Sequence, residues 1–173
     1  LYEEMDLRLF EDSLGFEWES NIFGIQEGEH FLPGAYNDAG WHHYAVQITD
    51  DVLSVYFDGV NVHEEIVSEE SPNFFDFSGP FNNLLIGANS DQQSSFFKGL
   101  ISEMKISSVA QYSENFNPDS LVADESTVSL WKFNTNSGDV LYDLSGNENH
   151  GTIYGDATWT TDVPGLYGQA GLI

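Results

Sequence analysis

The chain has 173 residues, of which 40% are hydrophobic and 14% aromatic, which is enough for one packed domain. It carries 29 acidic residues against 4 Lys and Arg, and the net charge of −25 disfavours nucleic acid and anionic membranes as partners by repulsion. It has no Cys, which excludes disulfides and thiol catalysis, and no apolar run approaches the roughly 18 residues of a membrane span.

The acidic residues are interleaved with aromatic and β-branched residues rather than collected in a tail. This pattern indicates a folded domain with an acidic surface, not a disordered segment. Such a surface needs cations to limit self-repulsion, and a saline environment is one setting that supplies them. In a secreted domain the lack of Cys suits a bacterial or archaeal surface better than an animal matrix, so we expect an extracellular or cell-surface location of that kind.

The first third of the chain predicts short strands at 5–10, 14–18, 22–25 and 30–32. Asp12-Ser13 and Glu27-Gly28 are the expected turns between them. Pro33-Gly34 then ends this group of strands.

The clearest pattern lies between Gly40 and Glu64. Two runs alternate hydrophobic and polar residues on either side of Asp50-Asp51, and Asp58-Gly59 begins a third. Period-two alternation interrupted by Asp and Gly predicts antiparallel hairpins, and Asp-Gly supplies the positive φ angles of a tight turn.

The second half of the chain predicts further strands at 83–88, 96–106 and 130–133, with one short helical turn at 119–122. The strand patterns place Trp41 and Trp131 in the core. His42 and His43 are consecutive, so they point to opposite faces of a strand and are expected to be structural rather than zinc ligands.

Two motifs carry a family resemblance. Trp-His-His-Tyr-Ala-Val at 41–46, followed by Val-Tyr-Phe-Asp-Gly at 55–59, resembles the central hairpin of laminin G-like domains of the concanavalin A-like superfamily. The segment 96–106 and the residues Ala110, Tyr112, Phe116 and Pro118 resemble the closing strand and exit segment of that family. The resemblance implies an all-β fold, an antiparallel β-sandwich with jelly-roll topology.

A third motif stands at an unexpected end of the chain. Trp131-Lys132-Phe133, then Asp-Leu-Ser-Gly-Asn-Glu-Asn-His-Gly at 143–151, resembles the opening signature of the same family. The signature could be repeated after the exit segment, the domain could be circularly permuted, or the chain could be an excerpt of a larger repeat protein. We expect one domain over 1–173, with the core in 1–133 and the signature loop and terminal strands in 134–173.

The resemblance implies calcium near the signature loop. Asp143, Asn147 and Asn149 offer side-chain oxygens, Gly146 permits a tight backbone, and Glu103 could approach from an adjacent strand. The alternative is a turn capped by its own hydrogen bonds. Ser102 stands where the family usually has Asp, which puts any role of that carboxylate in doubt.

No catalytic motif is complete, so we expect the chain not to be an enzyme. Glu4-Met5-Asp6 begins the carboxylate pattern that hydrolases of this fold use, but residues 7–9 do not continue it. Aromatic side chains near loops could instead stack against sugars. The candidates are Tyr36, Phe74, Phe96, Tyr154 and Trp159.

The sequence therefore predicts a calcium-stabilised extracellular recognition module, involved in adhesion, within a larger adhesin or secreted protein. Its expected partners are a glycan or surface protein and the neighbouring domains of the larger chain, without nucleic acid and without membrane insertion. The alternatives are a structural repeat that completes a sheet with its neighbours, and a polysaccharide-degrading enzyme.

Overall fold

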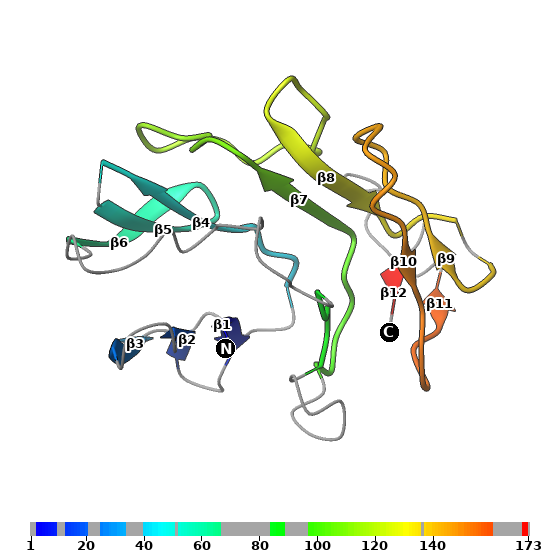
Figure 1. Ribbon diagram of the computed structural model, residues 1–173, viewed down its shortest axis with the longest axis horizontal. Coiled ribbons are helices and arrows are strands. Elements are labelled where there is room, and N and C mark those ends of the chain that lie inside the picture. Colours follow the sequence, from blue (N-terminus) through cyan, green and yellow to red (C-terminus); the bar gives the residue numbers. More distant parts are fainter. Residues whose placement is uncertain are drawn as a thin grey trace. The chain divides into compact units, whose positions relative to one another are not determined.

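A computed structural model describes residues 3–9, 13–20, 25–33, 40–50, 52–66, 84–88, 97–135, 137–160 and 171–172 (Figure 1). These residues form strands, turns and loops without a helix, and every strand pair is antiparallel. The all-β class expected from the sequence is therefore confirmed. Within these ranges, no helix exists that could cross a bilayer.

The chain divides into two compact units. The first comprises Leu1–Leu84 and Tyr112–Pro118, and the second comprises Leu85–Gln111 and Asp119–Ile173. Each unit is described below by itself.

The first unit begins with a three-stranded sheet. Its strands are β1 (Glu3–Leu9), β2 (Ser13–Ser20) and β3 (Ile25–Pro33), in the order β1-β2-β3. Strand β3 continues through Glu27-Gly28, so the turn expected there is wrong: Glu29 and Gly28 pair with Glu17 and Trp18 across the sheet, and the pairing register shifts next to them, between Trp18 and Ser20.

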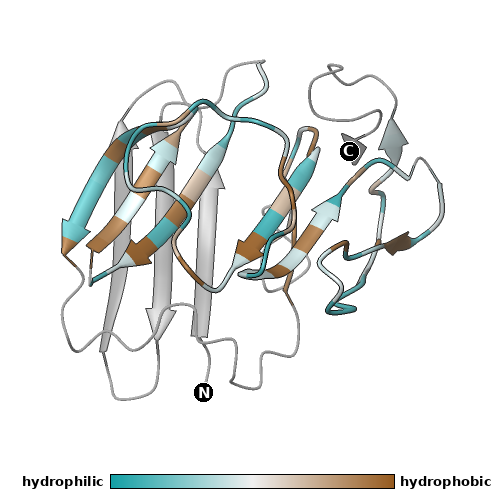
Figure 2. Cartoon of the chain, turned by 90° about the horizontal axis from the view of Figure 1, so that it is seen from above, coloured by the Kyte–Doolittle hydropathy of each residue, from teal (hydrophilic) through white to brown (hydrophobic). Residues whose placement is uncertain are grey.

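The central hairpins are confirmed. Strands β4 (Tyr44–Thr49), β5 (Val52–Phe57) and β6 (Val60–Ile66) form a sheet in that order. Asp58 and Gly59 have the positive φ angles that the sequence predicts, 49° and 76°, and Asp50 in the first turn also has a φ of 49°. Brown hydrophobic and teal hydrophilic residues follow one another along the strands that Figure 2 draws in colour.

The Asp58 carboxylate fixes the residues that precede β4. It accepts hydrogen bonds from the His43 backbone N–H (2.9 Å) and contacts Nδ1 of His42 (2.8 Å). The His42 ring also stacks on Phe57 with 4.7 Å between ring centroids. Both His residues are half-buried and make structural contacts, as expected.

The exit segment of the family pattern packs against this sheet. Tyr112 and Phe116 stack in parallel with 3.6 Å between ring centroids, and Tyr56 lies 5.7 Å from each ring. The buried amide of Gln47 is bound to the Tyr112 backbone at both ends, donating from Nε2 and accepting at Oε1. Burial raises the pKa of the Tyr112 hydroxyl.

The second unit is built on the pair β7 (Glu103–Ser107) and β8 (Thr127–Lys132). Two-residue strands complete it: β9 (Val140–Leu141) pairs with β10 (Gly151–Thr152), and β11 (Trp159–Thr160) pairs with β12 (Gly171–Leu172). The expected strand at 83–88 is wrong for its described residues 84–88, and of the described part of 96–106 only 103–106 is strand. The expected helical turn at 119–122 is likewise absent from those described residues.

The core of the second unit lies around Trp131, Phe133 and Leu141, which are 5%, 0% and 5% exposed. Partly buried hydrophobic side chains pack against them: Ile86, Ile101, Met104, Ile106 and Trp159. The core position expected for Trp131 is therefore confirmed, whereas Trp41 in the first unit is only half-buried.

Candidate functional site

The signature motif forms a short two-stranded ribbon with a loop at its end. Gly151 pairs with Leu141 and Thr152 pairs with Val140, and the Ile153 N–H donates to the Asp139 carbonyl (2.8 Å). Directly opposite residues in an antiparallel pair share one face, and neighbours alternate between faces. Leu141 is buried in the core, so the residues on either side of it point outward.

Asp143, the next residue that points inward, is a buried carboxylate surrounded by donors. Oδ1 accepts hydrogen bonds from the backbone N–H groups of Leu130 (2.9 Å) and Ser145 (2.9 Å). Oδ2 accepts from the Ser145 hydroxyl (2.6 Å) and the Asn149 N–H (3.0 Å). Both oxygens are thereby satisfied within the protein.

Two opposing effects set the pKa of Asp143. Burial raises the pKa, but the hydrogen bonds from Leu130, Ser145 and Asn149 outweigh burial and hold the pKa below its usual range. The carboxylate is therefore charged at neutral pH and binds the loop together as an anion.

The two Asn side chains attach the loop to strand β8. The Asn147 amide nitrogen donates to the carbonyls of Thr127 (3.0 Å) and Val128 (2.9 Å), and the Asn149 amide nitrogen donates to Val128 (3.1 Å). In return, the Trp131 indole donates to the Asn149 carbonyl (2.9 Å). Gly146, with φ of 92°, makes the turn between Ser145 and Asn147.

The residues expected to bind calcium are only partly brought together. Asp143, Gly146, Asn147 and Asn149 share the loop, but Glu103 pairs with Lys132 (3.1 Å) and accepts from the Ser120 hydroxyl and the Leu121 N–H. Lys132 and Trp131 are neighbours on β8, so the Glu103 side chain lies on the face opposite to Trp131, which itself bridges to Asp143.

The donor set of the loop does not fit a calcium ion. Calcium takes about 6–8 oxygens, whereas both Asp143 oxygens face N–H and O–H groups, and both Asn side chains direct N–H groups at β8. In the described ranges, no three His, Asp or Glu side chains gather as a metal group. Calcium binding therefore stays a prediction that rests on the family resemblance, and the hydrogen bonds of the loop argue against it.

The geometry gives a prediction for metal removal. Because the hydrogen bonds of Asp143 do not need an ion, we expect the melting temperature to be the same in millimolar calcium and in EDTA at constant ionic strength. Differential scanning calorimetry checks this, with magnesium as the control for general screening of the acidic surface. A rise in melting temperature with calcium alone, lost in Asp143→Asn, would contradict the hydrogen-bonded arrangement.

The aromatic candidates for carbohydrate differ in their placement. Tyr36, Phe74 and Phe96 lie outside the described residues. Trp159 packs against the core and its indole donates to the Gly138 carbonyl (2.8 Å). Tyr154, in contrast, is 80% exposed.

Sequence reasoning missed Tyr142, which is 53% exposed beside the buried Leu141 and Asp143. Its ring packs edge-on against His150 with 5.4 Å between ring centroids. The alternation of Leu141, Tyr142 and Asp143 was the available signal, since two inward side chains require the one between them to point outward.

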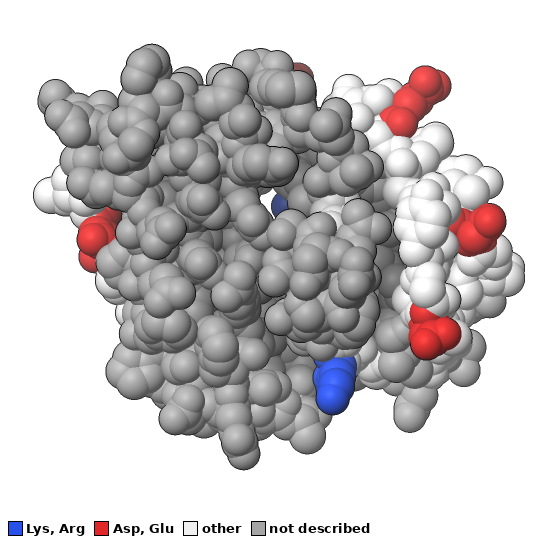
Figure 3. All heavy atoms as spheres, turned by 60° about the horizontal axis from the view of Figure 1, so that its bottom comes forward, with Lys and Arg blue, Asp and Glu red and all other residues white. Residues whose placement is uncertain are grey.

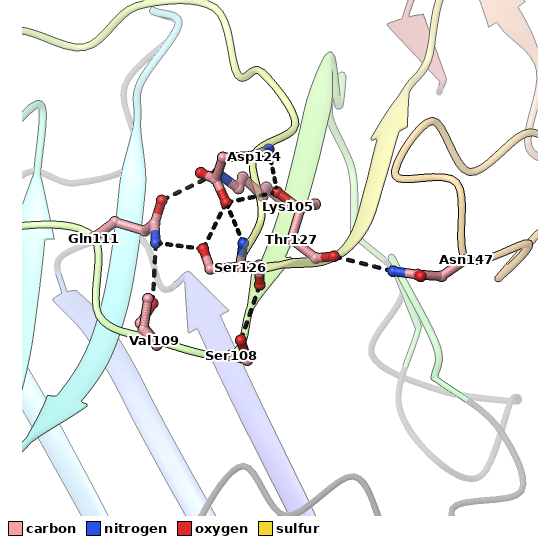
Figure 4. A network of polar contacts seen from close by, with 8 residues as sticks. All are labelled: Lys105, Ser108, Val109, Gln111, Asp124, Ser126, Thr127 and Asn147. Carbon is pink, nitrogen blue, oxygen red and sulfur yellow. Dashed lines mark hydrogen bonds and ion pairs between the residues drawn. The ribbon is translucent and has the colours of Figure 1, made fainter.

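A second polar network lies at the start of β8 (Figure 4). Lys105 binds Asp124 (2.5 Å) and Gln111 (3.0 Å), and Asp124 also accepts from the Ser126 hydroxyl (2.6 Å). The hydrogen bonds from Lys105 and then from Ser126 hold the pKa of Asp124 far below its usual range. All these polar groups bind one another, so the network fixes the turn before β8.

Comparison with known proteins agrees with the fold. A laminin G family model, described as Concanavalin A-like lectin/glucanases superfamily, matches residues 6–115. The search of curated proteins gave no match, and neither did the search of solved structures. Strand β7 lies inside the matched residues and β8 outside them, yet the two strands pair.

The matched region covers more than half of the 173 residues and includes the central hairpins on which the resemblance was based. The chain therefore belongs to the laminin G-like family of the concanavalin A-like lectin/glucanase superfamily, whose fold is an antiparallel β-sandwich.

Proposed function

We propose that this chain is a non-catalytic extracellular recognition module that binds carbohydrate through the outward side of the β9–β10 ribbon. We call this surface the ribbon face; it consists of Tyr142, His150, Thr152 and Tyr154. The observation that carries the proposal is the exposure of its two tyrosine rings, 53% for Tyr142 and 80% for Tyr154.

The ribbon face has the chemistry of a sugar site. Tyrosine offers an apolar ring that stacks on the C–H face of a sugar and a hydroxyl that binds to water or ligand. Thr152 and His150 add polar groups beside the rings. The core contact of Leu141 and the hydrogen bonds of Asp143 hold the ribbon in place, so little conformational entropy is lost when a ligand binds.

The arrangement of carboxylates supports the non-catalytic part of the proposal. General acid–base chemistry on a glycosidic bond needs two available carboxyl groups about 5–10 Å apart. Of the two carboxylates in the 143–151 loop, Asp143 is buried and fully hydrogen-bonded, so it cannot exchange protons with a ligand on the ribbon face, which leaves Glu148 as the one exposed carboxylate of the loop.

Affinity electrophoresis through gels that contain polysaccharides tests the proposal. We expect at least one polysaccharide to retard the protein and the double variant Tyr142→Ala/Tyr154→Ala to bind about tenfold or more weakly, since each stacking contact contributes about 0.5–1.5 kcal/mol. Val122→Ala removes an exposed hydrophobic side chain elsewhere in the same unit and should bind normally. Unretarded migration in every gel, or release of reducing sugar, would contradict the proposal.

A structural repeat that completes a sheet with its neighbours is the second candidate. Strand β6 is the last strand in the order β4-β5-β6, and its Val60 and Ile66 are 50% and 79% exposed. An edge strand with exposed hydrophobic residues can pair with another chain. Concentration-dependent association in sedimentation, reduced by Ile66→Lys and without sugar binding, would favour this candidate.

A further inference from the structure

The ribbon face is an extended surface with a ring at each end. Tyr142 lies beside His150, and Tyr154 follows His150 by four residues, which corresponds to about 13 Å of extended strand. The pairing of Thr152 with Val140 and the hydrogen bond from Ile153 to Asp139 keep the intervening residues in ribbon geometry. A ligand that contacts both rings must therefore be elongated.

Charge at this surface is of one sign. Exposed Glu148 precedes His150 by two residues, and exposed Asp156 follows Tyr154 by two, so an acidic residue flanks each side of the segment 150–154 along the chain. The sequence contains no Lys or Arg after Lys132, and the Lys132 ammonium is bound to Glu103 and Ser120. Described Asp and Glu side chains also project from the surface in Figure 3.

His150 is held in place by the loop residue Asp143. Its Nδ1 accepts a hydrogen bond from the Asp143 N–H (3.1 Å). The ribbon face and the residues that flank it therefore bring together two tyrosine rings and the carboxylates of Glu148 and Asp156, without a described Lys or Arg among them.

We propose that the ribbon face takes a linear polymer of amino sugars that carry free ammonium groups. The inference rests on the proposed carbohydrate function and adds the charge class of the ligand. The ammonium groups pair with Glu148 and Asp156 and lie against the faces of the tyrosine rings, while the apolar sides of the sugars stack on the same rings. A polyanionic glycan meets only repulsion at this surface.

A sugar polymer suits the face better than a basic peptide. The face is a two-stranded ribbon with flat, amphipathic tyrosine rings, which match the C–H faces of sugar rings better than the flexible aliphatic side chains of Lys or Arg. Polylysine is accordingly included in the test as a competing occupant.

Isothermal titration calorimetry compares three probes of equal length: oligomers of glucosamine at slightly acidic pH, the fully N-acetylated oligomers as the uncharged match, and oligogalacturonate as the anion. We expect the glucosamine oligomer to bind most tightly, with about fivefold weaker binding after Tyr154→Ala, the size of a moderate cation–π and stacking loss. The double variant Glu148→Gln/Asp156→Asn should weaken binding of the glucosamine oligomer and leave binding of the other two probes unchanged. Glu114→Gln, an exposed acid outside the ribbon, is the matched control for general attraction to the acidic chain.

The outcomes separate the two proposals. Equal or tighter binding of the N-acetylated oligomer overturns the charge inference and leaves the carbohydrate function standing, whereas no binding of any sugar overturns both. Polylysine binding that depends on Tyr154, or glucosamine binding that Glu114→Gln weakens as much as the ribbon variants do, also overturns the inference.

Discussion

Replacing Gly59 by Ala is expected to destabilise the protein by about 4 kcal/mol or more, a loss that few single substitutions reach. A Cβ at Gly59 would lie 1.9 Å from the carbonyl oxygen of Phe116, which is backbone and cannot rotate away. The Gly59 φ of 76° adds a further cost of about 1–2 kcal/mol for any residue with a side chain. The Gly59 carbonyl also accepts from the Phe116 N–H (2.9 Å), so the two segments cannot separate without breaking that bond.

Gly138→Ala provides the matched control, because Gly138 has a similar φ of 85° but no atom within 4 Å of its Cβ position. Gly138→Ala should lower the free energy of unfolding only by the cost of placing a side chain at positive φ, about 1–2 kcal/mol. Urea unfolding followed by tryptophan fluorescence compares the two variants. An equal loss of unfolding free energy in the two variants would show that the Phe116 backbone does not approach Gly59 as closely as described.

Replacing Asp143 by Ala is expected to cost about 3–5 kcal/mol. The substitution removes four hydrogen bonds to a buried charge and leaves the N–H groups of Leu130, Ser145 and Asn149 without this acceptor, each such loss being worth about 1–3 kcal/mol before relaxation. Asp139→Ala, an exposed carboxylate two residues before Leu141, should change stability by less than about 0.5 kcal/mol.

The contribution of Asp143 depends on pH in a defined direction. Its pKa in the folded protein lies below the ordinary value of about 3.9, so its stabilisation is fully present above that value and is lost as the pH falls through the folded pKa. The difference in unfolding free energy between wild type and Asp143→Ala should therefore be largest at neutral pH and shrink in acid. A difference that is constant down to about pH 2 would show that the carboxylate charge contributes nothing.

The central hairpins could be predicted because their signals are local. Asp58-Gly59 favours a tight turn by its own backbone preference, and the alternation from Tyr44 to Phe57 places alternate side chains on each face. The family resemblance was carried by the same stretch, and the family match confirms it.

Signals that depend on distant partners were less reliable. Glu27-Gly28 has the composition of a turn, but strand β2 pairs with β3 across it, and this pairing overrides a weak local preference. The hydrophobic residues at 84–88 predict a strand. Hydrophobic runs of this length also occur in irregular segments that pack on a core, as Ile86 does.

The loop at 143–151 shows a different limit. The sequence shows that oxygen-bearing side chains are close together, but it does not show which way they point or which donors surround them. Here Oδ1 of Asp143 accepts from the backbone N–H of Leu130, thirteen residues away, and this partner cannot be inferred from the motif itself. The same folding event turns Tyr142 outward and creates the ribbon face.

The most direct test of the ribbon face is a titration of the isotopically labelled protein with the best-binding sugar oligomer, monitored by ¹⁵N–¹H correlation spectra. We predict the largest shift changes at the amides of Tyr142, His150, Thr152 and Tyr154, with small changes in strands β4 to β6. Saturable shifts confined to β4 to β6, with the ribbon amides unmoved, would contradict the assignment of the binding surface.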